Sequence, residues 1–312
     1  MRSFSADEVG LAVLGWPINH SISPYLHNEA LSELRGRDSR FDGWSYERLE
    51  VRAEELPTLL PQLGQRGYRG LNLTIPHKVE VIPHLMDIDP EAEVMGAVNT
   101  LQWLDGGWKG FNTDGYGLQR ALETVFELQL KSCAVLILGA GGAARAAAAR
   151  GLAEGCPEVC ITNRSPSRLS SLVEDLSKQF PNSSLRSFPP EAMPTQILDF
   201  PELIIINATS LGLQSKDPAP IDLTLHEWRP NTRVYDMIYN PSQTALLKTA
   251  ADFGISCSNG LSMLVHQALR SLEICTGCEF SANAMFAGAE KRMKEIAPCW
   301  NGSFRANSEW LP

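Results

Sequence analysis

The sequence has no apolar stretch long enough to cross a lipid bilayer. Its longest mainly apolar run extends from Cys133 to Ala144, contains three glycines and ends at Arg145, whereas a membrane-spanning helix needs about 20 such residues. Near the N-terminus, Asp7 and Glu8 interrupt any apolar or basic run, which is atypical of a signal or transit peptide. The sequence therefore predicts a cytoplasmic protein without a membrane partner.

Positive charge is also scarce. The chain has 27 Lys and Arg against 36 Asp and Glu, a formal net charge of -9. Such a chain has no global positive field to attract polyanions, so nucleic acid is not an expected partner. A small anionic ligand is still compatible with this charge, because it needs only a local positive site.

Cysteine is infrequent, and its seven residues are an odd number. This usage indicates reduced thiols rather than a disulfide framework. Cys275 and Cys278 have the spacing of a metal or redox pair, but two further ligands are not evident nearby. A structural zinc site needs four ligands, so we predict no metal.

The length and the apolar pattern predict two α/β domains. At about 150 residues per domain, 312 residues suggest two, and 44% hydrophobic with 20% charged residues excludes a disordered chain. Short apolar runs alternate with helical periodicity, which is typical of parallel sheets covered by helices. We predict strands at residues 11–14, 44–51, 68–75, 97–103, 108–111, 133–138, 159–162, 203–207 and 234–237, and helices at 23–34, 53–65, 114–128, 142–154, 167–179, 242–253, 261–276 and 282–296. No element is assigned to 181–201, and Cys299 to Pro312 is expected to be a loose tail.

A glycine-rich turn stands between an apolar strand and an Ala-rich helix. The sequence Gly-Ala-Gly-Gly-Ala-Ala begins at Gly139, in the context that a dinucleotide-binding turn requires. Glycines let the backbone approach a pyrophosphate, and the positive end of the helix attracts it. The sequence therefore predicts a Rossmann-type domain.

The residues after the next strand favour NADP over NAD. An Asp or Glu there would accept hydrogen bonds from the ribose hydroxyls of NAD, but Asn163 to Arg168 contains no acid. Arg164 and Arg168 can instead clamp a 2′-phosphate, because guanidinium groups match phosphate oxygens. Alternatively, Arg168 only occupies the first turn of a helix.

Polar residues also follow the strands of the first third. Ser21 and Ser23, two apart in a segment expected to be extended, can donate two hydrogen bonds to one carboxylate; the alternative is that Ser23 only caps a helix. Lys78 is expected at the start of a further helix after Pro76, where a cation opposes the helix dipole. A position that breaks a local rule suggests a functional site. Asn99 and Asp114 add an amide and a carboxylate, and Asp114 is also a plausible helix N-cap.

Taken together, these segments resemble the shikimate and quinate dehydrogenase family from about Leu11 to Ile296. The matching motifs are Gly-x-Pro-Ile-x-His-Ser-x-Ser-Pro, Asn-x-Thr-x-Pro-x-Lys, Gly-Ala-Val-Asn-Thr, Asn-Thr-Asp-Gly, Gly-Ala-Gly-Gly-Ala, Asn-Ala-Thr-Ser-x-Gly, Tyr-Asp-Met-x-Tyr and Gly-x-x-Met-Leu-Val-x-Gln. The resemblance implies two α/β domains with a cleft between them. Residues 1–113 plus 261–312 would form the substrate domain, with a mostly parallel sheet, and 114–260 the NADP-binding domain.

The resemblance also implies roles for individual residues. Lys78 and Asp114 match the catalytic pair, and Ser21 and Ser23 match residues that bind the substrate carboxylate. Further substrate positions would be Thr74, Asn99, Tyr239 and Gln267. Cofactor positions would be Gly139, Gly141, Gly142, Ala143, Asn163, Arg164, Ser165, Arg168, Thr209, Met237 and Gly260. Two positions depart from the family pattern: Ser165 replaces a common threonine, and Trp16 a small polar residue.

The activity implied is the NADP-dependent, reversible reduction of 3-dehydroshikimate to shikimate in aromatic amino-acid biosynthesis, by hydride transfer at C3. The Lys/Asp pair would move the hydroxyl proton. One alternative is a quinate or dual-specificity dehydrogenase that uses NAD. Another is a catalytically silent member that senses a dinucleotide or metabolite, which predicts loss of Lys78 or Asp114. The expected partner is a small-molecule substrate, and a homodimer is considered as the assembly.

Overall fold

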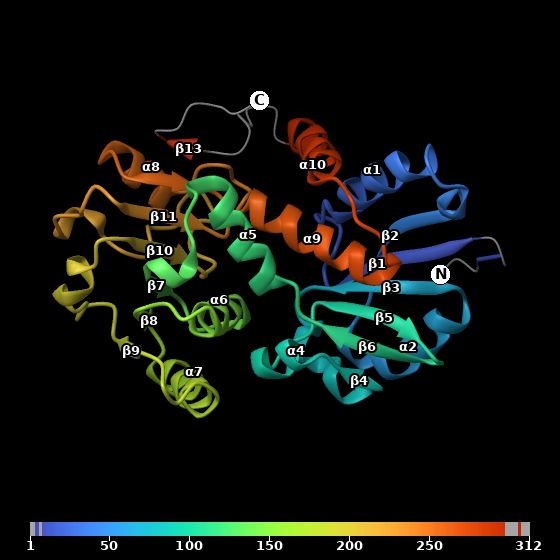
Figure 1. Cartoon of the computed structure of the whole chain (residues 1–312), viewed down its shortest axis with the longest axis horizontal. Coiled ribbons are helices and arrows are strands. Elements are labelled where there is room, and N and C mark those ends of the chain that lie inside the picture. Colours follow the sequence, from blue (N-terminus) through green and yellow to red (C-terminus); the bar gives the residue numbers. More distant parts are fainter. Residues whose placement is uncertain (1–3, 6–7, 297–304, 307–312) are drawn as a thin grey trace. The chain divides into compact units, whose positions relative to one another are not determined.

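The computed structural model describes residues 4–5, 8–296 and 305–306. The chain forms two compact units (Figure 1). Of the described residues, the first unit contains those up to Gly117 and from Val265 to Ile296, and the second contains Leu118–Leu264 with Arg305 and Ala306. Apart from Arg305 and Ala306, the predicted loose tail lies outside the described residues. Among the helices described, none is both long enough and apolar enough to cross a membrane.

The first unit contains a six-stranded sheet. Its strand order is β2 (Trp44–Glu50), β1 (Val9–Gly15), β3 (Tyr68–Leu73), β5 (Thr100–Leu104), β6 (Gly107–Phe111) and β4 (Asp87–Ile88). The pairs β1–β2, β1–β3 and β4–β6 are parallel, whereas β3–β5 and β5–β6 are antiparallel. The mostly parallel sheet is therefore confirmed, and β5 and β6 form a hairpin. The hairpin turns through Asp105 and Gly106, both with positive φ.

Helices pack against this sheet. On one face, α2 (Leu56–Gln65) places Leu56, Leu60 and Leu63 in a core with Leu71 and Leu73 of β3. Elsewhere, α9 (Leu261–Thr276) approaches β3 so closely that a Cβ at Gly70 would overlap the thiol of Cys275. The helices α1 (Ser23–Arg35) and α10 (Ala282–Ile296) pack against each other. Short helices α3 (His77–Glu80) and α4 (Pro90–Met95) complete the unit.

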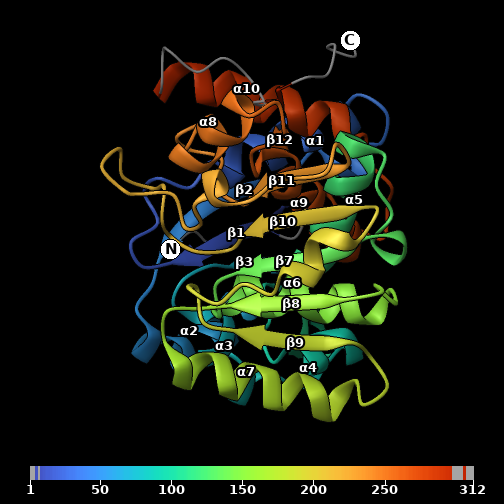
Figure 2. The ribbon, with the colours of Figure 1, turned by 90° about the vertical axis from the view of Figure 1, so that its left-hand side faces the viewer.

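The second unit has a seven-stranded sheet in the order β13 (Arg305–Ala306), β12 (Ser256–Ser258), β11 (Thr232–Asp236), β10 (Leu203–Asn207), β7 (Ala134–Leu138), β8 (Val159–Thr162), β9 (Leu185–Phe188). All pairs are parallel except β12–β13. From β7 the chain builds outward to β9, then returns to place β10 on the other side of β7 (Figure 2). Doubly wound folds bind ligands at this reversal of strand order.

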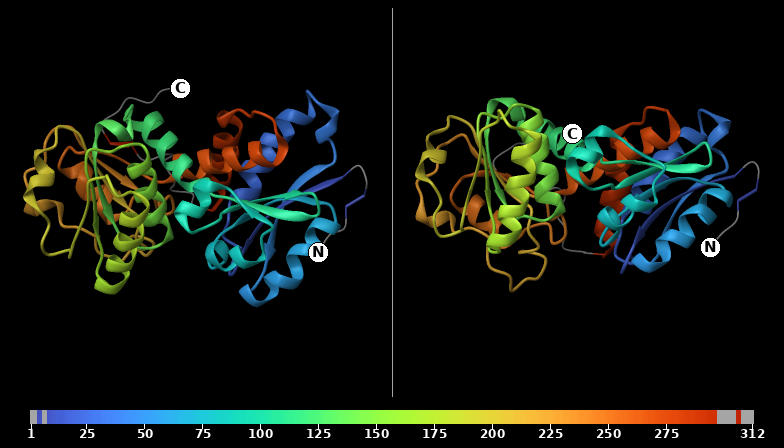
Figure 3. Two further views of the ribbon diagram at one scale, coloured as in Figure 1. Left: turned by 60° about the horizontal axis from the view of Figure 1, so that its bottom comes forward. Right: turned by 90° about the horizontal axis from the view of Figure 1, so that it is seen from below.

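Helices cover both faces of the second sheet. On one side lie α6 (Gly142–Ala153) and α7 (Pro166–Gln179), which Figure 3 shows in green and yellow-green. The helix α8 (Ala245–Asp252) packs on β11 and β12. All five residues of β7 and of β10 are buried, as expected for strands covered on both faces. The boundaries between the two units fall inside α5 (Asp114–Phe126) and α9.

Some predicted elements differ from the structure. The strand expected from residue 97 begins only at Thr100, because the helix α4 ends at its C-cap Gly96, which has positive φ, and residues 97–99 connect that helix to the strand. The helix expected from 242 begins at Ala245, since Thr244 caps it by accepting a hydrogen bond from the Leu247 amide. The short elements β4, β9, β12 and α4 were not predicted. Each has at most six residues, too few for a periodic pattern to emerge.

Candidate active site

In the first unit, the loops that follow β1 and β3 lie against each other. The Trp16 amide donates to the Ile75 carbonyl at 3.1 Å, and the Thr74 amide donates to the Leu14 carbonyl at 3.0 Å. A Cβ at Gly15 would lie 2.5 Å from Cγ2 of Thr74, so glycine is needed for this approach. The serine-bearing loop and the segment that leads to Lys78 are therefore neighbours.

Ser21 and Ser23 place their hydroxyl groups side by side. Their Oγ atoms are 3.2 Å apart, and both residues are half-buried. The expected extended segment is wrong: Ile22 between them has helical dihedrals, so a turn brings the hydroxyls together. The N-cap alternative is also wrong, because Ser23 is the first residue of α1 and no side chain caps that helix.

Lys78 and Asp114 form an ion pair. The distance from Lys78 Nζ to Asp114 Oδ2 is 2.6 Å, and the side chains are 31% and 10% exposed. Lys78 lies in α3, as expected, and this helix is anchored by buried His77, whose Nε2 is 2.8 Å from the Val51 carbonyl. Burial lowers the pKa of His77, so its ring is neutral at pH 7. The other N–H groups of Lys78 make no hydrogen bond within the described part of the chain.

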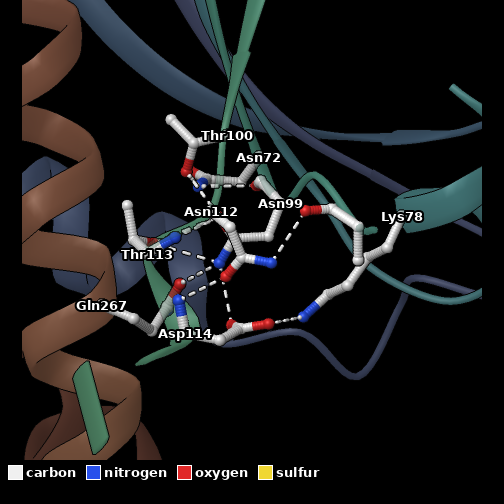
Figure 4. Close-up of polar contacts among 9 residues, drawn as sticks. Asn72, Lys78, Asn99, Thr100, Asn112, Thr113, Asp114 and Gln267 are labelled. Carbon is white, nitrogen blue, oxygen red and sulfur yellow. Dashed lines mark hydrogen bonds and ion pairs between the residues drawn. The ribbon is translucent and has the colours of Figure 1, made fainter. Parts of the chain in front are cut away.

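Asp114 is oriented by its neighbours rather than by a capping role. It is the first residue of α5, and its amide donates to Asn112 Oδ1 at 2.9 Å. The expectation that Asp114 is the N-cap is therefore wrong, because its carboxylate binds other side chains instead. Oδ1 accepts a hydrogen bond from Asn99 Nδ2 at 2.8 Å, and Oδ2 accepts one from Lys78 (Figure 4).

The amide of Asn99 can satisfy these contacts in only one orientation. Its Oδ1 accepts from the Thr113 amide at 2.9 Å and from the Thr100 hydroxyl at 3.0 Å, so its Nδ2 must face Asp114. The same Nδ2 is 3.4 Å from Oε1 of Gln267 on α9. Asn99 therefore joins the predicted catalytic pair to a predicted substrate residue.

A row of buried polar side chains behind Asn99 was not predicted. Asn72 Nδ2 donates to Thr100 Oγ1 at 3.2 Å and to Ser271 Oγ at 2.7 Å. The Tyr46 hydroxyl donates to Asn72 Oδ1 at 2.8 Å. An available signal was the amide of Asn72 inside the otherwise apolar Leu71–Leu73 segment, because buried polar groups are retained where a network satisfies them.

The structure groups most of the predicted substrate and catalytic residues in the first unit. Lys78, Asp114, Asn99 and Gln267 are joined by contacts, while Ser21, Ser23 and Thr74 lie in the paired loops. Tyr239 is half-buried and follows β11 in the second unit. Tyr239 is therefore the one predicted substrate residue that the first unit does not contain.

In the second unit, the glycine-rich turn lies at the reversal of strand order. Gly139 has φ of 118°, and a Cβ there would lie 3.0 Å from the Ala208 carbonyl oxygen after β10. At Gly141 and Gly142 a Cβ would meet no atom within 4 Å. The helix α6 begins there, with Ala143 in its first turn and neither a side-chain cap nor an acid. This open helix N-terminus fits a pyrophosphate.

The segment after β8 presents two unpaired guanidinium groups. Arg164 and Arg168 are exposed, and neither makes a hydrogen bond or ion pair with the residues described. Asn163 Nδ2 donates to the Ser165 carbonyl at 3.0 Å, and Ser165 is the N-cap residue of α7. Arg168 lies in the first turn of α7, as the alternative interpretation expects. Because its guanidinium is exposed there, it can still bind a phosphate. The segment fits a 2′-phosphate and offers no carboxylate for NAD.

The remaining cofactor positions lie together at the ends of β10, β11 and β12. The Met237 amide donates to the Asn207 carbonyl at 3.0 Å, and the Gly260 amide donates to the Ile238 carbonyl at 3.1 Å. A Cβ at Gly260 would overlap the Met237 carbonyl oxygen. Thr209 donates its hydroxyl to Asn207 Oδ1 at 2.8 Å. These loops are adjacent to the glycine-rich turn through the contact of Gly139 with Ala208 and Thr209.

Comparisons with known proteins agree with this arrangement. Residues 13–101 match the family model "Shikimate dehydrogenase substrate binding domain", and residues 120–198 match "Shikimate / quinate 5-dehydrogenase". The shikimate dehydrogenase (NADP(+)) of Geobacter metallireducens is 38% identical over 271 residues, covering 86% of this chain and 91% of that protein.

Solved structures show the same fold. The shikimate 5-dehydrogenase of Thermus thermophilus, solved with NADP(H) and shikimate, is 34% identical with a TM-score of 0.77, covering 91% of this chain and 99% of that one. The quinate dehydrogenase of Corynebacterium glutamicum, solved with NAD, is 26% identical with a TM-score of 0.80, covering 91% and 99%. The predicted resemblance is therefore confirmed, and the chain belongs to the shikimate dehydrogenase family.

Proposed function

We propose that this protein is an NADP-dependent shikimate dehydrogenase, which reversibly reduces 3-dehydroshikimate to shikimate in aromatic amino-acid biosynthesis. The observation that carries the proposal is the Lys78–Asp114 ion pair, held by Asn99 beside a loop with two adjacent serine hydroxyls. A relative that is 38% identical bears the name of this activity. The presence of both Lys78 and Asp114 argues against a silent sensor.

Lys78 and Asp114 would carry out the acid–base step. Bound NADP supplies or accepts the hydride at C3 of the substrate. As the ketone becomes an alcohol, its oxygen must gain a proton, and in the reverse direction the hydroxyl must lose one. One N–H of Lys78 is held by Asp114, which leaves two to donate to the reacting oxygen. The mobile proton belongs to the coupled pair rather than to one partner.

The remaining polar groups of the first unit would hold the substrate. Ser21 and Ser23 can donate two hydrogen bonds to its carboxylate because their hydroxyls lie 3.2 Å apart. Thr74, Asn99 and Gln267 would bind the ring hydroxyls, and Tyr239 would approach the carboxylate. In this assignment residues 1–113 plus 261–312 form the substrate domain, and residues 114–260 form the cofactor domain.

The second unit would hold NADP. The pyrophosphate would lie against the open N-terminus of α6, formed by Gly139, Gly141, Gly142 and Ala143. At the adenosine end would be Asn163, Arg164, Ser165 and Arg168, where two exposed cations match a phosphate. Thr209, Met237 and Gly260 would line the cofactor or its nicotinamide ring. A cytoplasmic location and a homodimer remain predictions.

Initial rates in a two-by-two design test the proposal. Shikimate or quinate is combined with NADP or NAD, and the reduced nicotinamide is followed by absorbance. We expect strong preference for shikimate with NADP. If quinate with NAD were used equally well or better, the assignment of Arg164 and Arg168 would be wrong. Dinucleotide binding without turnover of any pair would instead support a silent sensor.

A further inference from the structure

A buried carboxylate that the proposed reaction does not use lies at the end of β11. Asp236 has no exposed surface. Its Oδ1 accepts hydrogen bonds from Asn207 Nδ2 at 2.9 Å and the Ile238 amide at 3.0 Å, and its Oδ2 accepts one from the Thr244 hydroxyl at 2.6 Å. Burial raises the pKa of Asp236 to about 6, while these hydrogen bonds oppose the shift. The carboxylate is therefore mainly ionised at neutral pH, where it remains an acceptor only.

The first contact of Asp236 sets the orientation of the Asn207 amide. Because Nδ2 of Asn207 faces the carboxylate, its Oδ1 faces the following loop and accepts from the Thr209 amide at 3.0 Å and the Thr209 hydroxyl at 2.8 Å. If the amide turned over, its oxygen would face the carboxylate and its N–H groups would face the Thr209 amide. Asp236, together with the Leu211 carbonyl, which accepts from the same Nδ2 at 3.2 Å, therefore fixes the amide orientation that holds Thr209.

The second contact holds the turn after β11. The Ile238 amide donates to Asp236, and the Ile238 carbonyl accepts from the Gly260 amide at 3.1 Å. Met237, between Asp236 and Ile238, is packed against Gly260 so closely that a Cβ would not fit. One carboxylate thus connects the three loops that carry Thr209, Met237 and Gly260.

We propose that Asp236 is a positioning residue, which holds these three loops in the geometry that binds the nicotinamide half of NADP. This inference rests on the proposed function. An apolar residue would fill a core position without the desolvation cost of a buried charge. Asp236 instead directs two of its three hydrogen bonds to the predicted cofactor loops, which is the arrangement expected of a residue that positions them.

Replacement of Asp236 by alanine tests the inference through binding, measured separately for the two halves of the cofactor. The probes are NADPH, followed by its fluorescence, and adenosine 2′,5′-bisphosphate, which carries the adenosine end but no nicotinamide, followed by calorimetry. We expect Asp236→Ala to raise the dissociation constant for NADPH about 10-fold, which is about 1.4 kcal/mol. The constant for the bisphosphate should change less than about 2-fold, because the segment from Asn163 to Arg168 makes none of these contacts.

The matched control is Glu158→Ala. Glu158 is also a buried carboxylate of the second unit, 4% exposed. It accepts a hydrogen bond from the Ser184 hydroxyl at 2.6 Å and forms an ion pair with Arg186 at 3.0 Å. It precedes β8, at the opposite end of that strand from the segment that carries Arg164. We expect this variant to bind both probes as the wild type does.

Two further comparisons separate positioning from loss of folding. Asp236→Asn keeps an Oδ1 that can accept both loop hydrogen bonds, so it should restore NADPH affinity to within about 3-fold of the wild type. If Asp236→Ala does not fold, Thr244→Val removes one hydroxyl from the carboxylate and should weaken NADPH alone by about 3-fold. Thr244→Ser retains that hydroxyl and should behave as the wild type.

The outcomes are distinct. Selective loss of NADPH affinity supports the inference. Equal weakening of NADPH and the bisphosphate shows a general structural role and overturns it, as does unchanged NADPH binding in both Asp236→Ala and Thr244→Val. If the wild type binds neither probe, the proposed function fails, and the inference that rests on it fails before any variant is compared.

Discussion

Lys78→Ala is expected to lower turnover with shikimate and NADP by about 10²-fold or more, with the KM for shikimate nearly unchanged. The ammonium group is the donor nearest the Asp114 carboxylate, at 2.6 Å, and the proposed role is to exchange a proton with the reacting oxygen as it gains or loses charge. An interaction made mainly in the transition state affects kcat rather than KM. Steady-state rates over a range of shikimate concentrations measure both constants.

Lys109→Ala is a matched control in the same unit. Lys109 forms a comparable ion pair, 2.7 Å from Asp87, with 28% of its side chain exposed, but it lies on β6 and contacts no predicted site residue. Its replacement should leave kcat within about 2-fold, because Lys109 contacts no predicted site residue and a solvent-screened ion pair adds little to folding stability. A large rise in KM for Lys78→Ala with little change in kcat would mean that Lys78 binds substrate rather than moving a proton.

Arg164→Ala is expected to raise the KM for NADP by about 10- to 100-fold and to leave the KM for NAD nearly unchanged. Hydrogen bonds to charged groups contribute about 1.5–3 kcal/mol, and each 1.4 kcal/mol is a factor of ten. The side chain is exposed and makes no hydrogen bond within the described residues, so its removal should cost little stability. Because NAD lacks the 2′-phosphate, the ratio of the two KM values isolates the contact.

Arg229→Ala supplies the comparison for Arg164. Arg229 is 51% exposed in the same unit and pairs with Asp199 at 3.4 Å, and it has no predicted role in binding. Its loss should leave the KM values for both dinucleotides unchanged. An equal rise for NADP and NAD in Arg164→Ala would contradict the 2′-phosphate assignment and would place this guanidinium near a group that both cofactors share.

Local patterns in the sequence were sufficient for most of the fold. The four-residue strand β8 and the helices α9 and α10 have the predicted bounds, because each has either a continuous apolar run or a long helical period. The glycine-rich turn was predictable for a similar reason, since strand, turn and helix are adjacent in sequence. The motifs also identified the family, which the comparisons confirm.

Contacts between distant residues decided the rest. Lys78 and Asp114 are 36 positions apart, and their ion pair depends on how β3, the Asn99 loop and the start of α5 converge. The serines meet through a turn at Ile22 that the sequence suggested was extended. In the sequence, Asn72 and Asp236 are polar residues beside apolar neighbours, without visible partners. Folding brings Asn72 to Tyr46, Thr100 and Ser271. It brings Asp236 to Asn207 and Thr244. Periodicity reports which face of an element is buried, whereas the partner of a buried polar group is set by tertiary packing, because its hydrogen bonds must be satisfied by whatever segment packs there.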